Sequence, residues 1–146
     1  MSERKQNKKI DKRAPVIVGV GDLVDRSKED GLNPQELLAK ACEHAIQDSG
    51  IKELNKHIDY MGVVRFTVDF LTATNQSNFQ YSNFPRTLAN KLNISAKNEV
   101  YAPMGGNSPQ VLLEDALVKI STGETDCALL SGCLLYTSPS PRDSDT

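Results

Sequence analysis

The chain has 146 residues and a mass of 16.0 kDa, with 38% hydrophobic and 25% charged residues, which fits one domain of an ordinary water-soluble protein. This composition excludes a fibre, a coiled coil and a disulfide miniprotein. The apolar stretches are far shorter than the roughly 20 residues that cross a bilayer, so we expect no membrane span. The basic amino terminus is not followed by an apolar segment, so we expect no secretory signal and a cytoplasmic location.

The net charge of −2 conceals an asymmetry between the first 13 residues and the rest. Six of the 17 basic residues lie in residues 1–13, which predicts a disordered basic tail on an acidic body. That tail has no aromatic residue to stack on bases, so we expect no nucleic-acid partner. The three cysteines form no CxxC pair and only two histidines are present, so neither a disulfide framework nor a metal site is expected.

The first half of the chain predicts a βαβ unit. The β-branched run from Val16 to Val20 is typical of a strand buried on both faces of a parallel sheet. Asn33 and Pro34 then predict a helix start, and Gly50 its end. The apolar stripe of this helix consists of Leu37, Leu38, Ala41, Ala45 and Ile46. Residues 58–68 form the next predicted strand.

The second half continues the alternation of helices and strands. A long polar loop is predicted over residues 67–82, a short helix over residues 83–93 and a strand over residues 99–104. Ser108 is the predicted N-cap of another helix that ends at Gly123, and residues 126–131 form a further strand. The predicted buried side of the helix that ends at Gly123 consists of Leu112, Leu113, Ala116, Leu117 and Ile120. The whole order predicts an α/β fold.

Two glycine-containing turns are candidate binding loops. Gly19 and Gly21 invite a dinucleotide interpretation, but the fingerprint needs a third glycine where Val24 stands, so a nucleotide-binding α/β domain remains only one alternative. The stronger candidate is the loop Gly105-Gly106-Asn107-Ser108, which brings backbone N–H donors to a helix amino terminus that favours anions. The alternative is a helix that is simply well capped.

Several segments in order resemble the amino-terminal half of the thiolase superfamily, with the strongest likeness to the sterol-carrier-type acetyl-CoA acetyltransferase branch. They are Pro15 to Gly21, the helix from Asn33 with Ala41 and Ala45, Gly105 to Gln110, and Ser121 to Asp126. The resemblance covers residues 14–132 and implies a partial domain: an incomplete three-layer half-fold, with a mostly parallel sheet and helices on both of its faces. It also implies a coenzyme A thioester as the substrate, with no covalently bound cofactor.

The resemblance also locates the family's nucleophilic cysteine. Counting back from Gly123-Glu124-Thr125-Asp126 places Gly106 at that position and Ser108 on the family serine. Ser108 is a weak candidate for a replacement nucleophile, because no histidine is near it in the sequence. Cys42 and Cys127 are expected to be core residues. The catalytic position is therefore vacant, and Gly105, Gly106, Asn107 and Ser108 are the expected substrate-binding residues.

The resemblance predicts a fragment of an acyl-CoA acyltransferase-like protein that lacks the usual cysteine and is itself inactive. The alternative is a non-catalytic thiolase-fold protein that binds acyl-CoA. The expected partner is therefore an acyl-CoA-type small molecule, and a homodimer of the whole protein remains open. Finally, the segment from Cys133 to Asp143 resembles the in-frame translation of a transposase sequencing adaptor, so residues 133–146 are interpreted as a non-native tail.

Overall fold

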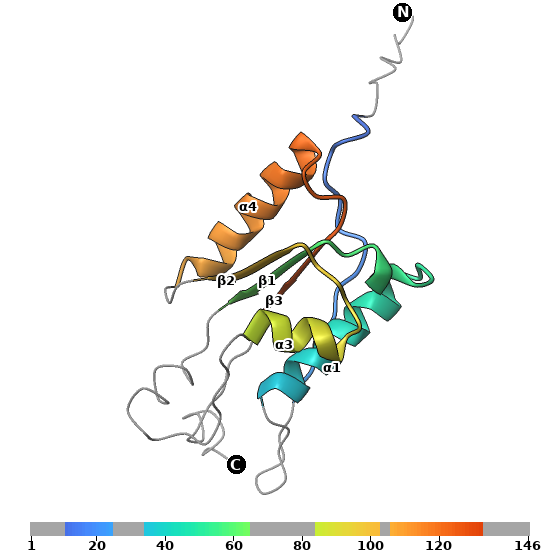
Figure 1. The fold of residues 1–146 in the computed structure, drawn as a ribbon, viewed down its shortest axis with the longest axis vertical. Coiled ribbons are helices and arrows are strands. Elements are labelled where there is room, and N and C mark those ends of the chain that lie inside the picture. The colour runs from blue at the N-terminus through green and yellow to red at the C-terminus, as the bar shows by residue number, and fades with distance from the viewer. Residues whose placement is uncertain (1–10, 25–33, 65–83, 103–105, 133–146) are drawn as a thin grey trace, which may run out of the picture.

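The computed structural model describes residues 11–24, 34–64, 84–102 and 106–132 (Figure 1). In chain order, the elements are α1 (Pro34–Asp48), the 3-10 turn η1 (Leu54–Lys56), β1 (Tyr60–Val64), α3 (Phe84–Lys91), β2 (Asn98–Ala102), α4 (Ser108–Thr122) and β3 (Ala128–Ser131). The three predicted helices and the three later strands are confirmed, and η1 was not predicted. The predicted loop at residues 67–82, residues 1–10 of the predicted tail at residues 1–13, and the predicted tail at residues 133–146 lie outside the described residues.

The three strands form one parallel sheet in the order β2-β1-β3. Tyr60 at the start of β1 is in register with Asn98 of β2 and Ala128 of β3. The helix α4, which connects β2 to β3, covers one face of this sheet, and α1 and α3 cover the other (Figure 1). The predicted α/β class, with a parallel sheet between helices, is confirmed.

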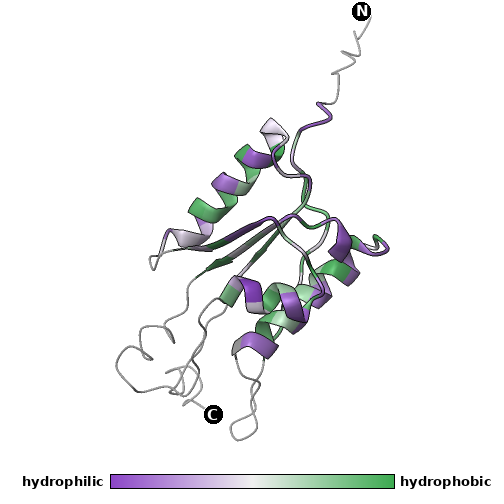
Figure 2. Cartoon of the chain, viewed as in Figure 1, coloured by the Kyte–Doolittle hydropathy of each residue, from purple (hydrophilic) through white to green (hydrophobic). Residues whose placement is uncertain are grey.

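The two faces of β1 bury different groups, because successive side chains of a strand point to opposite faces. Met61 and Val63 belong to the hydrophobic core on the side of α1 and α3, and both are fully buried. Tyr60 contacts Asp115 of α4 on the other face. Figure 2 shows helices in which apolar and hydrophilic residues alternate. The rest of the core cluster is Leu38, Ala39, Cys42, Leu54, Ile58, Phe84, Leu88, Ala89, Leu92, Ile94, Ala96 and Leu129.

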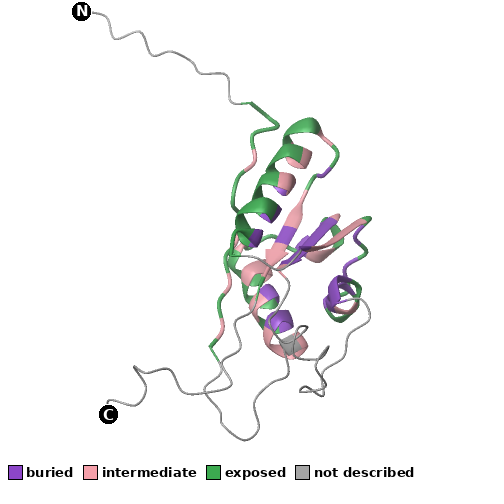
Figure 3. Cartoon of the chain, turned by 90° about the vertical axis from the view of Figure 1, so that its left-hand side faces the viewer, coloured by how far each residue is buried: buried purple, intermediate pink, exposed green. Residues whose placement is uncertain are grey.

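The predicted strand from Val16 to Val20 is wrong for this structure. Residues 11–24, here called the N-terminal strap, contain no strand, and Val16, Ile17 and Val20 are 76%, 83% and 68% exposed (Figure 3). Because β1 pairs directly with β3, residues 16–20 occupy no position between these two strands. The strap lies against α1 instead.

The apolar stripes predicted for α1 and α4 lie on the correct helix faces, but they are wider than the stripes of residues that the structure buries. Leu38 is buried on α1, whereas the other predicted members of that stripe are partly buried. On α4, Leu112 and Ala116 are buried, but Leu113 and Leu117 are 38% and 37% exposed. Because the helices and strands that α4 mainly contacts are the three strands, a single narrow stripe is covered rather than the full apolar face.

Candidate functional site

The candidate loop lies at the carboxyl edge of the sheet. β2 ends at Ala102 and α4 begins at Ser108, so the connection between them brings the amino end of α4 to the edge where the parallel strands end. Ligands of open α/β sheets bind at this edge. Of the four predicted binding residues, Gly106, Asn107 and Ser108 meet here, whereas Gly105 lies outside the described residues.

The predicted N-cap is wrong by one residue. Asn107 is the N-cap of α4, with φ −93° and ψ −1°, and its side chain makes no capping hydrogen bond. Its carbonyl oxygen accepts a hydrogen bond from the Val111 amide at 3.1 Å, which starts the helical ladder. Ser108 is instead the first residue of α4 and is only 3% exposed. Burial of Ser108 anchors the first turn, while the exposed Asn107 leaves the helix amino terminus accessible.

Gly106 faces open space. A Cβ atom added at this glycine meets no heavy atom within 4 Å, and Gly106 itself is exposed. Unsatisfied N–H groups and the positive end of the helix dipole favour an anion or a polarised oxygen at such a terminus. The site therefore offers the positive end of the α4 dipole with room beside it, although Pro109 has no N–H to donate and the Val111 amide is used within the helix.

Neither described cysteine supplies a nucleophile to this site. Burial raises the pKa of the Cys42 thiol to about 11, an effect that the Ser131 side chain offsets only in part. Burial, together with the charges of Asp59 and Asp126, also raises the pKa of the Cys127 thiol. Cys42 belongs to α1, on the face of the sheet opposite α4, and Cys127 precedes β3 at the other end of the sheet. Because both thiols stay protonated at neutral pH, both are structural residues, as the sequence predicted.

His44, His57 and the glycine turn at Gly19 and Gly21 also lie away from the start of α4. His44 is exposed on α1, with its Nδ1 atom 3.2 Å from the carbonyl oxygen of Asp22, and His57 follows η1. Gly19 packs against the end of α1 and Gly21 against its middle, where added Cβ atoms would meet the carbonyl oxygens of Ala45 and Ala41 respectively. A dinucleotide loop presents its glycines to a helix amino terminus, so this contact does not favour nucleotide binding.

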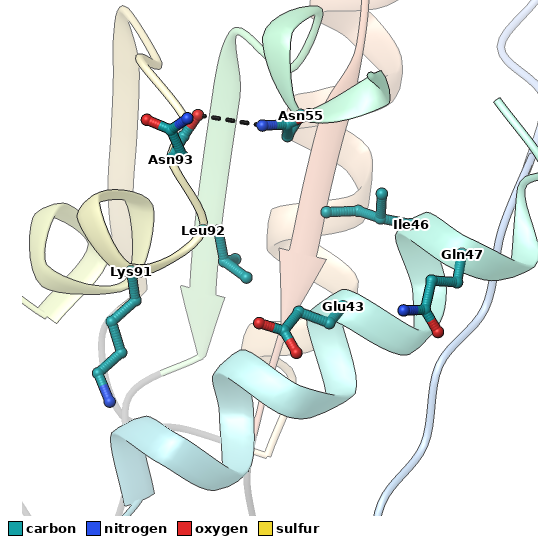
Figure 4. A pocket seen from close by; sticks show the side chains of 7 residues that line it. All are labelled: Glu43, Ile46, Gln47, Asn55, Lys91, Leu92 and Asn93. Carbon is teal, nitrogen blue, oxygen red and sulfur yellow. Dashed lines mark hydrogen bonds between the residues drawn. The ribbon is translucent and has the colours of Figure 1, made fainter. Parts of the chain in front are cut away.

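A pocket of about 230 Å³ lies between α1, η1 and the end of α3 (Figure 4). One end is closed by the Asn55 side-chain amide, which donates a hydrogen bond to the Asn93 carbonyl oxygen at 3.3 Å. Its lining consists of Glu43, Ile46, Gln47, Asn55, Lys91, Leu92 and Asn93. This pocket is on the face of the sheet opposite α4, so it does not extend the candidate site. Among the described residues, no group of three or more acidic, histidine or cysteine side chains could hold a metal ion.

Sequence reasoning missed the polar contact that positions α4. The Tyr60 hydroxyl donates to Asp115 Oδ2 at 2.7 Å, and Lys119 Nζ donates to both oxygens of the same carboxylate at 2.8 Å. The pKa of Asp115 is lowered, chiefly by the hydrogen bond from Lys119 and next by the hydrogen bond from Tyr60. The pKa of Tyr60 is raised, chiefly by burial and next by its hydrogen bond to Asp115. The spacing of Asp115 and Lys119 on one helix face was visible in the sequence, but their partner on β1 was not.

None of the helices in the described part of the chain is long and apolar enough to cross a membrane. No protein-family model matches the chain, and no curated protein matches it.

Among solved structures, the chain is similar to the crystal structure of a monomeric SCP2-thiolase like protein type 1 from Mycobacterium smegmatis. The TM-score is 0.70 and the sequence identity 32%, over 88% of this chain and 25% of that one. The chain therefore spans about a quarter of the length of the protein that it matches. The three-stranded parallel sheet with helices on both faces matches part of that structure and is a thiolase-like half-fold.

Proposed function

We propose that this chain is part of a thiolase-like acyltransferase that acts on acyl-CoA thioesters, and that the amino end of α4 binds the thioester group. The observation that carries the proposal is the accessible start of α4 beside Gly106, in a chain that is 32% identical to an SCP2-thiolase-like protein. The amino-terminal amides of α4 are suited to hold the carbonyl oxygen of a thioester, because that oxygen becomes more negative when the carbonyl carbon is attacked.

A second candidate is a non-catalytic protein that binds acyl-CoA through the same residues. It is favoured by the chemistry of the described cysteines, which are protonated at neutral pH and are not at the start of α4. Glycine at the position of the family's nucleophile leaves donors that polarise a thioester but no thiol that captures its acyl group. Under either candidate we expect the chain by itself to bind acetyl-CoA without transferring the acetyl group.

Titration of the full chain with acetyl-CoA and with free coenzyme A tests the proposal. We expect acetyl-CoA to bind more tightly, because free coenzyme A lacks the thioester carbonyl oxygen that the start of α4 would hold. The Gly106→Asp substitution places a carboxylate at the donors and should weaken acetyl-CoA binding by about tenfold. The matched control is Val118→Asp, which adds the same charge at an exposed position in the carboxyl-terminal third of α4 and should leave binding unchanged. Equal affinity of the two variants, or no binding by the wild-type chain, would contradict the proposal.

A further inference from the structure

The pocket between α1, η1 and the end of α3 has an apolar floor and a charged rim. Leu92 is 7% exposed and Ile46 is half-buried, and both side chains point into the space between α1 and α3 (Figure 4). Glu43 of α1 and Lys91, the last residue of α3, line the same pocket and are exposed. Pockets for drug-sized ligands have roughly 300–1,000 Å³. The volume of about 230 Å³ therefore suits a smaller molecule.

The two charges at the rim are available to a ligand. Among the described residues, the Glu43 carboxylate and the Lys91 ammonium form no ion pair or hydrogen bond, either with each other or with another group. Lys56 and Lys119, in contrast, each form an ion pair with a nearby carboxylate. A ligand that carries both charges can therefore pair with Glu43 and with Lys91 at the same time.

The wall between η1 and α3 is held in place by its own backbone and hydrogen bonds. The hydrogen bond from Asn55 to the Asn93 carbonyl oxygen joins η1 to the end of α3. The amides of Leu92 and Ile94 donate to carbonyl oxygens within α3. Asn93 and Glu53, on either side of this wall, are the two non-glycine residues of the described chain with left-handed backbone, both with φ 57°. Such residues cluster at ligand sites, and a preformed wall lowers the entropy lost on binding.

We propose that this pocket binds a small zwitterion in which a short methylene chain separates an ammonium group from a carboxylate. Glu43 accepts from the ligand ammonium, Lys91 donates to the ligand carboxylate, and the methylene chain covers Leu92 and Ile46. A ligand with one charge leaves the other rim group without a partner, so the pocket selects for both. The start of α4 lies on the opposite face of the sheet, so this site is independent of the proposed thioester site.

Titration of the full chain with 6-aminohexanoate, followed through the NMR signals of its backbone amides, tests this site. We expect the amides of Asn55 and Asn93 to shift until they saturate. Hexanoate and hexylamine, which each lack one charge, should bind about fivefold more weakly.

Variants of the two rim residues test their roles. Glu43→Gln and Lys91→Gln should each weaken the binding of 6-aminohexanoate by about fivefold. Both residues are exposed, so neither substitution removes a core contact. The matched control is Glu114→Gln, which makes the same change at an exposed position of α4 and should leave binding unchanged.

A charge exchange tests whether the two rim groups act together. Glu43→Lys places two ammonium groups at the rim and should remove binding, whereas the double variant with Lys91→Glu should restore it with the ligand reversed. Four results would overturn the proposal. They are no saturable shift at Asn55 or Asn93, equal affinity for 6-aminohexanoate and its singly charged analogues, equal effects of Glu43→Gln and Glu114→Gln, or a double variant that binds no better than Glu43→Lys.

Discussion

The Gly106→Cys variant is expected to become acetylated by acetyl-CoA at neutral pH, unlike the wild-type chain. A Cβ atom at Gly106 meets no neighbour within 4 Å, so the cysteine fits without displacing the backbone. The start of α4 lowers the pKa of a thiol placed there and so increases the fraction present as thiolate. The thiolate attacks the thioester carbonyl carbon, the bond from that carbon to the coenzyme A sulfur breaks, and coenzyme A leaves as a thiolate that takes a proton from water.

Intact-protein mass spectrometry detects the acetyl group, and the rate of reaction with a thiol reagent reports the pKa. We expect the thiol of Gly106→Cys to react about tenfold faster at pH 7 than that of Val118→Cys, whose exposed position lies far from the amino end of α4. Cys42 and Cys127 provide an internal reference, because burial raises both of their pKa values. Equal reaction rates of the two engineered cysteines would show that the start of α4 does not activate a thiol.

Replacement of Asp115 by alanine is expected to destabilise the fold by about 2 kcal/mol, the usual cost of removing a charged acceptor from a buried donor. The variant leaves the buried Tyr60 hydroxyl and the half-buried Lys119 ammonium without their shared carboxylate. The matched control is Glu114→Ala, which removes the neighbouring exposed carboxylate with its long 3.4 Å contact to Gln110 and should cost less than about 0.5 kcal/mol. Urea denaturation measures both losses.

The loss of stability caused by Asp115→Ala is expected to depend on pH. The pKa of Asp115 is lower in the folded chain than in the unfolded chain, so its contribution to stability is complete above the unfolded pKa of about 4. That contribution is lost as the pH falls through the folded pKa. The stability difference between the wild type and Asp115→Ala should therefore shrink from pH 7 toward pH 3. A difference that stays constant over this range would show that Asp115 acts through packing rather than through its charge.

Local signals in the sequence were sufficient to predict most of the fold. Pro34 at a helix start, and Pro109 and Gly123 at the two ends of α4, act within a single turn, so the chain around them is enough to predict the helices. The alternation of these helices with apolar runs predicted the parallel sheet. The amino end of α4 was predicted for the same reason, although Asn107 rather than Ser108 occupies the N-cap.

The errors concern contacts between segments that are distant in the sequence. The run from Val16 to Val20 has the composition of a buried strand, but it lies exposed beside α1, where Gly19 and Gly21 approach the helix backbone. The hydrogen bond from Tyr60 to Asp115 joins residues 55 positions apart, so no local pattern indicates it. The widths of the buried stripes on α1 and α4 likewise depend on which elements cover each helix.

The most direct test of the proposed thioester site is the response of individual backbone amides when acetyl-CoA is added to the full chain. We expect the NMR signals of Gly106, Asn107 and Ser108 to shift with one common dissociation constant, while free coenzyme A shifts them less. The amides beside the pocket at Glu43, Asn55 and Asn93 should not respond, because that pocket lies on the opposite face of the sheet. Shifts at the pocket with none at the start of α4 would contradict the assignment of the acyl-CoA site.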